Sequence, residues 1–127
     1  MRREIVSTTA APHPGGAYSQ AVAVGDLVFT SSLVPTDPGT GQIVTPDDIE
    51  AQTRQVLRNL RAVLEAAGSS LECTVHITAY IDTGRWTQFN TAYGEFFPSS
   101  PPARSIVERT PSNDGVCVAM DAVAVRR

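Results

Sequence analysis

The sequence predicts an α+β fold in one domain over residues 1–127, with a mixed β-sheet that carries two helices on one face. Three observations predict it. The length of 127 residues fits a single domain. Segments with helical periodicity alternate with short apolar segments that have strand periodicity. Each helical segment has one apolar stripe, so it can cover a sheet from one side only.

The N-terminal part predicts three short strands. Residues 3–7 (REIVS) form an opening strand, and residues 8–20 form a loop rich in proline and glycine. Residues 21–34 contain two apolar runs that meet at Gly25-Asp26, a dipeptide typical of a hairpin turn.

The first helix has the clearest signals. Thr45 is the expected N-cap, Pro46 takes the first helical position, and Asp47 and Asp48 place negative charge at the positive end of the helix dipole. Gly68 ends the helix. The predicted apolar stripe contains Ile49, Thr53, Val56, Leu57, Leu60, Val63, Leu64 and Ala67.

The C-terminal part predicts strand, helix, strand, strand. A strand over 73–81 is expected to alternate, and a second helix lies within 83–97. Strands over 103–109 and 115–126 follow, and strands joined through helices are expected to pair in parallel. One face of the 73–81 strand is predicted to carry Cys73, Val75, Ile77, Ala79 and Ile81.

The last strand is apolar on both sides, although the two helices can cover only one face of the sheet. An uncovered apolar sheet face is usually buried against another subunit. The sequence therefore predicts an oligomer.

Composition excludes several classes. A net charge of −3 argues against a nucleic-acid partner. Cys73 and Cys117 lack a partner cluster and resemble buried small hydrophobes, and no metal-ligand or phosphate-loop motif is present. We therefore expect chemistry without metal or cofactor. Without an apolar leader or membrane-spanning run, the expected location is cytoplasmic.

Arg104 is the first candidate functional residue. It lies one residue inside a predicted strand, between the small residues Ala103 and Ser105. A planar guanidinium matches a carboxylate bidentately, so Arg104 could clamp an anionic ligand. The alternative is a surface arginine that pairs with a carboxylate of the chain.

Other candidates are polar groups near apolar segments. In "GGAYSQA", Gly15 and Gly16 allow a close backbone approach, and Tyr18 offers an aromatic wall, although it could equally pack on the core. Asn90 lies on the apolar stripe of the second helix, where a buried amide needs partners. His76 has no second ligand at metal spacing, which favours an interface histidine.

Six segments together carry a family resemblance: "GAYSQA", "LVFTSSLVP", "QTRQVLRNLRAVLEAAG", "FNTAYGEFF", "PPARSIVE" and "AVAVRR". They resemble the YjgF/Rid family, also called L-PSP endoribonuclease-like, over nearly the whole chain. The resemblance implies a chorismate-mutase-like fold, a homotrimer and ligand clefts between subunits. It also implies hydrolysis of reactive 2-enamine and 2-imine acids to 2-keto acids and ammonia.

The same resemblance implies site residues. Arg104 matches the arginine that holds a substrate carboxylate, Tyr18 matches a tyrosine of the cleft, and Asn90 matches an asparagine of the second helix. Asp121 completes the expected catalytic set. The expected substrate-binding set contains Arg104, Tyr18, Ser32, Asn90, Ile106 and Ala119.

Two positions depart from the family pattern. Active deaminases carry a glutamate where this chain has Ala119, and a glycine where it has Ser32, so only Asp121 remains near the missing carboxylate. Deaminase activity is therefore expected to be weak or redirected. The alternatives are a non-hydrolytic binder of small carboxylate metabolites, and an enzyme of a specialised pathway acting on a different imine or amide.

Overall fold

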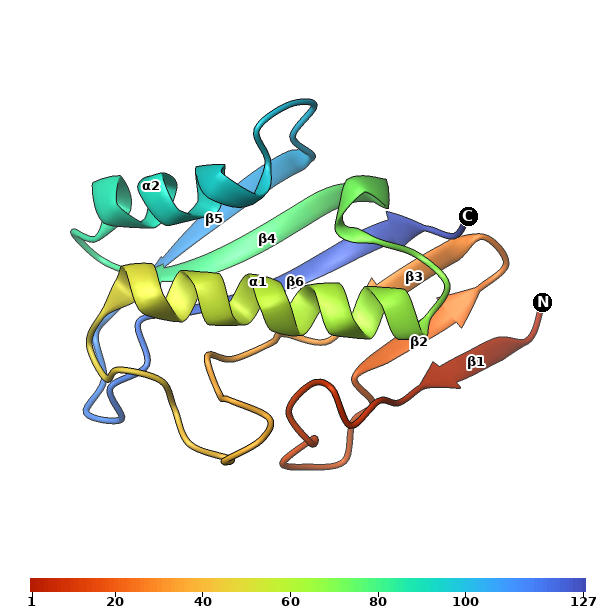
Figure 1. The fold of residues 1–127 in the computed structure, drawn as a ribbon, viewed down its shortest axis with the longest axis horizontal. Coiled ribbons are helices and arrows are strands. Elements are labelled where there is room, and N and C mark those ends of the chain that lie inside the picture. The colour runs from red at the N-terminus through yellow and green to blue at the C-terminus, as the bar shows by residue number, and fades with distance from the viewer.

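The computed structural model describes residues 1–127 and contains one six-stranded mixed sheet in the order β1-β2-β3-β6-β4-β5 (Figure 1). Two α-helices and a short 3₁₀ turn over Leu71–Cys73 complete the elements. The α-helices are α1 (Ile49–Ala66) and α2 (Trp86–Phe96), and the strands are β1 (Arg3–Val6), β2 (Ala21–Val24), β3 (Leu27–Thr30), β4 (Thr74–Asp82), β5 (Ala103–Arg109) and β6 (Val118–Val125).

The pairing of strands differs in one respect from the expectation. β4 and β5, which α2 connects, pair in parallel as predicted. β3 and β4, which flank α1, do not pair, because β6 lies between them and is antiparallel to both. β6 (VAMDAVAV) therefore has a hydrogen-bonded neighbour along each edge, and its residues are small or apolar at every position but Asp121, as is usual for a central strand.

Both helices cover one face of the sheet, as predicted (Figure 1). An ion pair between Arg54 of α1 and Glu95 of α2, with 2.8 Å between Nη2 and Oε2, joins the helices at their surface. Every residue of the predicted α1 stripe is buried. Gly68 has a φ of 82° directly after the C-cap Ala67, as expected for a residue that ends a helix.

Helix α1 begins later than its sequence predicts. The N-cap is Asp48, whose carboxylate accepts a hydrogen bond from the backbone N–H of Ala51 at 3.0 Å, and the expected cap Thr45 lies in a loop. Gln52 explains the difference. Its fully buried amide donates to the carbonyl of Thr45 at 3.2 Å, and so holds the preceding loop across the first turn of the helix.

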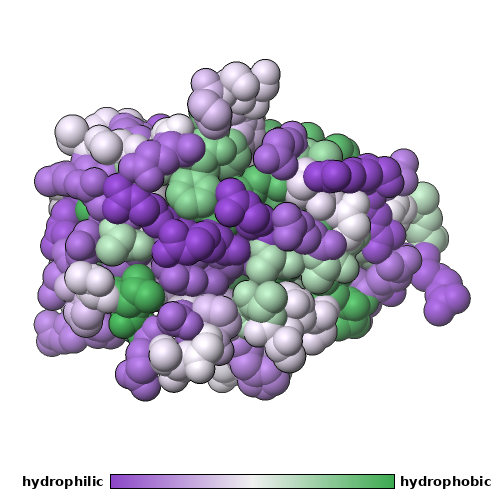
Figure 2. Space-filling view, viewed as in Figure 1, coloured by the Kyte–Doolittle hydropathy of each residue, from purple (hydrophilic) through white to green (hydrophobic).

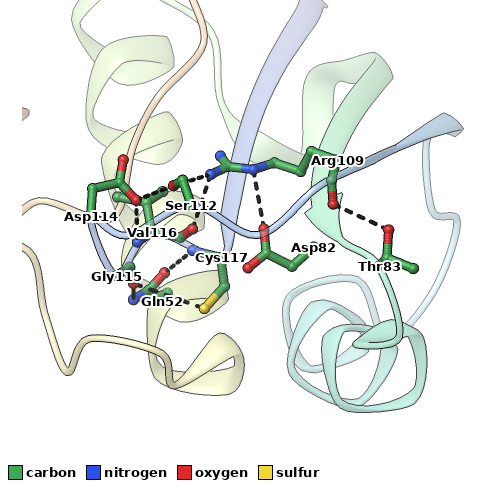
Figure 3. A network of polar contacts seen from close by, with 9 residues as sticks. All are labelled: Gln52, Asp82, Thr83, Arg109, Ser112, Asp114, Gly115, Val116 and Cys117. Atoms are coloured by element: carbon green, nitrogen blue, oxygen red, sulfur yellow. Dashed lines mark hydrogen bonds and ion pairs between the residues drawn. The ribbon is translucent and has the colours of Figure 1, made fainter.

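The Gln52 amide also holds the segment before β6 (Figure 3). Nε2 donates to the carbonyl of Gly115 at 2.7 Å, and Oε1 accepts from the backbone N–H of Cys117 at 2.7 Å. Arg109 contacts the other side of this segment. Its Nε lies 3.1 Å from Oδ1 of the buried Asp82, and its Nη2 donates to the carbonyl of Val116 at 3.1 Å. The loop between β5 and β6 is therefore fixed by buried polar contacts.

The alternation predicted for β4 holds only in its second half. The register shifts between Thr74 and His76, so Val75 lies in a bulge and is exposed, and Cys73 belongs to the 3₁₀ turn. From Ile77 onward, alternate residues are buried under the helices. A bulge adds one residue to one strand, so the side chains beyond it face the opposite sides from those that strict alternation predicts.

The second face of the sheet has no cover within the chain. Pairing aligns Ile5 with Val22, Val22 with Phe29 and Phe29 with Val123, so these side chains form one apolar row across four strands. Phe29 is 45% exposed. The helix side, by contrast, has a largely hydrophilic surface (Figure 2). None of the helices combines the length and the hydropathy needed to cross a bilayer.

Candidate functional site

Arg104 lies on the helix side of edge strand β5, where it pairs with Ile77. Its Nη1 donates a hydrogen bond to Oδ1 of Asn90 on α2 at 3.0 Å. No carboxylate of the chain lies within ion-pair distance of it. The alternative of a surface arginine paired within the chain therefore does not apply, and most of the guanidinium donors remain free.

Three aromatic rings of α2 surround this guanidinium. Cζ of Arg104 lies 4.8 Å from the ring centre of Tyr93, 5.5 Å from that of Phe89 and 5.6 Å from that of Trp86. Cation–π attraction stabilises the charge without neutralising it. The aromatic stripe of α2 thus positions a cation that still lacks a counter-ion.

A pocket of about 360 Å³ opens beside Arg104 and Asn90. Tyr93 also lines it, and its hydroxyl is buried without a hydrogen-bond partner. Burial raises the pKa of the Tyr93 hydroxyl, and the charge of Arg104 opposes that rise. The remaining lining residues are Gly94, Phe97, Pro101 and Pro102. A small anion would find one guanidinium and one amide in this pocket.

Asp121 forms a second polar group on the helix-free face of the sheet. Its Oδ2 accepts a hydrogen bond from the hydroxyl of Tyr80 at 2.9 Å and another from the hydroxyl of Ser32 at 3.2 Å. The hydrogen bond to Asp121 raises the pKa of the Tyr80 hydroxyl, and partial burial and the carboxylate charge add to the effect. The sequence does not mark Tyr80 as a site residue.

Ala119 and Asp121 face the same side of β6, with Ala119 directly opposite Tyr80. Arg104 lies on the other side of the sheet, together with Ile106, which packs against the core. One chain therefore does not bring Arg104 and Asp121 together, because the sheet separates them. The polar groups form two half-sites: Arg104 with Asn90, and Asp121 with Ser32 and Tyr80.

Tyr18 lies in the loop before β2 and is 52% exposed, so it does not pack on the core. Its hydroxyl accepts a hydrogen bond from the backbone N–H of Gly15 at 3.2 Å. It lines a depression of about 630 Å³ with Ile5 and Phe29 of the helix-free face. Tyr18 is thus on the side of Asp121 rather than of the Arg104 pocket.

The residues beside Tyr18 in the sequence belong to the structure of the loop and form no site of their own. Gly15 and Gly16 have no positive φ, so the unusual backbone angles that they allow are not used. Gln20 is buried, and its amide donates to the carbonyls of Thr8 and Pro12 at 3.0 and 2.9 Å. His76 lies within 3.2 Å of the Ser105 hydroxyl on the helix-free face.

Comparison with known proteins gives consistent results. Residues 8–126 match the family described as Endoribonuclease L-PSP. A RutC family protein of Pyrococcus abyssi is 41% identical over 127 residues, which cover 99% of each chain. A putative endoribonuclease of Thermotoga maritima has a structure with a TM-score of 0.91, at 38% identity and with 100% and 99% of the two chains covered. The structure of E. coli TdcF, solved with bound serine, has a TM-score of 0.89 at 34% identity, with 98% of this chain and 99% of that chain covered.

Proposed function

Because the chain belongs to the L-PSP or YjgF/Rid family, we propose that it hydrolyses small 2-imino acids and their 2-enamine tautomers to 2-keto acids and ammonia. The observation that carries this proposal is the state of Arg104. Its guanidinium is held by Asn90 and three rings, has no carboxylate partner and borders a pocket. The carboxylate of an imino acid supplies the missing negative charge.

A relative supports a ligand of this kind. E. coli TdcF was solved with serine, which carries a carboxylate beside a nitrogen-bearing carbon. A 2-imino acid has the same carboxylate next to its C=N carbon. The Arg104 half-site would hold the carboxylate and leave the C=N carbon directed away from the pocket.

The second half-site supplies the proton-transfer group. Within one chain, Asp121 and Arg104 lie on opposite faces of the sheet. A substrate bound to Arg104 must therefore meet the Asp121 of another copy. We propose a homotrimer in which each cleft combines the Arg104 half-site of one chain with the Asp121 half-site and Tyr18 of the next. The exposed row from Ile5 to Val123 supports subunit contact on that face.

The substitution at Ala119 limits the expected rate. A general acid or base contributes typically 10²–10⁴-fold, and Asp121 is the carboxylate that remains on this face. Hydrolysis of an imine requires only a positioned water and one group that exchanges protons. We therefore expect measurable but modest acceleration.

Ala119 also favours a second candidate function, the non-hydrolytic binding of small carboxylates. The same Arg104 pocket would hold the ligand, without turnover. A specialised imine or amide substrate would be a variant of the first function in which Ser32 reshapes the part of the cleft beside Asp121. The endoribonuclease name of the family receives little support here, because a net charge of −3 provides weak attraction for phosphates.

The deciding experiment is incubation of the purified protein with freshly generated 2-iminopropionate, with release of the keto acid followed over time. Acceleration above the uncatalysed rate, lost in Arg104→Ala, supports hydrolysis. Calorimetric binding of small carboxylates with no acceleration would instead establish the binding function. A protein that neither binds nor accelerates would overturn both.

A further inference from the structure

Two hydroxyl groups converge on one oxygen of Asp121. Tyr80 and Ser32 are 41 and 89 residues away in sequence, and both donate to Oδ2, at 2.9 and 3.2 Å. The other oxygen, Oδ1, has no hydrogen-bond partner in the chain and is not sealed from solvent. The carboxylate therefore has one anchored oxygen and one available oxygen.

The β4–β6 register explains how Tyr80 reaches Asp121. Thr78 lies directly opposite Asp121, and Tyr80 lies opposite Ala119. A long side chain at Tyr80 reaches diagonally to the next residue on the same face. The methyl group of Ala119 leaves room for that path, whereas a longer side chain at position 119 would compete with the phenol for the same space.

We propose that Tyr80 is a positioning residue that, together with Ser32, holds Oδ2 of Asp121 so that Oδ1 faces the water attacking the substrate. This inference rests on the proposed imine hydrolysis. It assigns to Tyr80 and Ser32 the orientation of the only carboxylate that remains near position 119. Fixing an acid–base group by hydrogen bonds to its other atoms is a general means of raising its effectiveness.

The reaction balances with these groups. Water adds to the C=N carbon of the protonated imine, one of its protons passes to Oδ1 of Asp121, and the iminium nitrogen becomes an amine. The proton on Oδ1 then passes to that amine, the C–N bond breaks, and ammonia leaves. The remaining hydroxyl proton passes to Asp121 and from there to ammonia, so that one protonated imino acid and one water give one keto acid and one ammonium ion.

Tyr80 suits a positioning role better than proton transfer. The hydrogen bond to Asp121 raises the pKa of the phenol, which therefore stays protonated and remains a donor at physiological pH. A phenol of this kind holds a carboxylate but releases its own proton poorly. Acting through Asp121, it should affect the chemical step and leave the carboxylate contact with Arg104 intact.

The test is a double-mutant cycle in the full-length protein, measured as kcat and KM for 2-iminopropionate. Tyr80→Phe removes one hydroxyl at nearly constant shape, and Asp121→Asn removes the group through which it acts. We expect Tyr80→Phe to lower kcat on the order of 10-fold with little change in KM, as for a hydrogen bond to a charged group. In the Asp121→Asn background, Tyr80→Phe should lower kcat no further.

Ser105→Ala is the matched control, because it removes a hydroxyl from the same sheet face that contacts His76 instead of Asp121. An unchanged kcat in Tyr80→Phe would overturn the role of Tyr80 and leave the proposed function standing. An equal loss in both backgrounds would also overturn it, since Tyr80 would then act without Asp121. A wild-type protein without hydrolysis would overturn the proposed function itself, and this inference with it.

Discussion

The guanidinium of Arg104 and the amide of Asn90 face each other between β5 and α2, with Nη1 3.0 Å from Oδ1. This contact orients the arginine but leaves its charge uncompensated. Asn90 is only partly buried, and its amide oxygen finds its partner in Arg104, the residue that the sequence marks as an anion clamp.

Replacing Arg104 by alanine should weaken the binding of small carboxylates by roughly 10- to 100-fold, the effect of losing charge-assisted hydrogen bonds. Arg104→Lys should restore little, because an ammonium cannot bind both carboxylate oxygens and loses the contacts with the rings. Calorimetry with pyruvate measures both. Arg58→Ala, on the surface of α1, is the control for loss of charge. Unchanged affinity in Arg104→Ala would contradict the clamp.

Introducing the missing carboxylate should raise the rate. Ala119→Glu places an acid–base group on the face of Asp121, with an expected gain in kcat of at most about 10²–10⁴-fold. Because Tyr80 lies opposite this position, the gain should be smaller than that limit. Ala119→Gln controls for size without charge. If a folded Ala119→Glu protein releases keto acid no faster, the cleft serves another ligand.

A charge in the exposed apolar row should dissociate the proposed trimer. Phe29→Lys places an ammonium among Ile5, Val22 and Val123, where burial in an interface would leave it unpaired. Sedimentation equilibrium should then give the monomer mass, against three chain masses for the parent. Glu65→Lys, on the exposed surface of α1, should remain trimeric. A parent protein that is monomeric at micromolar concentration would exclude the shared cleft.

The Tyr80–Asp121 contact should make stability depend on pH in the alkaline range. The pKa of Tyr80 is raised in the folded protein, so its contribution is complete below about pH 10, the ordinary pKa of tyrosine, and disappears as pH rises through the raised value. Phenolate absorbance of the wild type minus Tyr80→Phe isolates this hydroxyl. In Asp121→Asn it should ionise at lower pH. Identical titration in both proteins would show that Asp121 does not cause the shift.

Replacement of Gln52 should lower the stability of the fold more than replacement of most other polar residues. Gln52→Ala leaves the buried N–H of Cys117 and carbonyl of Gly115 without partners, which we expect to lower the free energy of unfolding by about 3 kcal/mol. Chemical denaturation measures this loss. Gln88→Ala, exposed on α2, should change it by less than about 0.5 kcal/mol. Equal stabilities would show that the loop before β6 does not depend on this amide.

Local sequence determined the elements whose signals lie within a few residues. The stripe from Ile49 to Ala67 predicted a helix on one side of a sheet, and Gly25-Asp26 predicted the hairpin. The contacts of the Gln52 amide could not be anticipated, because its partners Gly115 and Cys117 lie more than sixty residues later in the chain. With these contacts in place, α1 is capped by Asp48 instead of the expected Thr45. The bulge at Val75 changed which side chains of β4 face the helices, and a strictly alternating pattern cannot predict such a change.

The same distinction applies to the site. Arg104 stood out in the sequence because a guanidinium at the start of an apolar strand needs a counter-charge, and such a need is visible in residue type alone. Only the tertiary structure decided that Arg104 and Asp121 occupy opposite faces of the sheet, and that Tyr80 joins Ser32 at one oxygen of Asp121. The physical reason is that β6 inserts between β3 and β4, and no local pattern encodes which strands become neighbours.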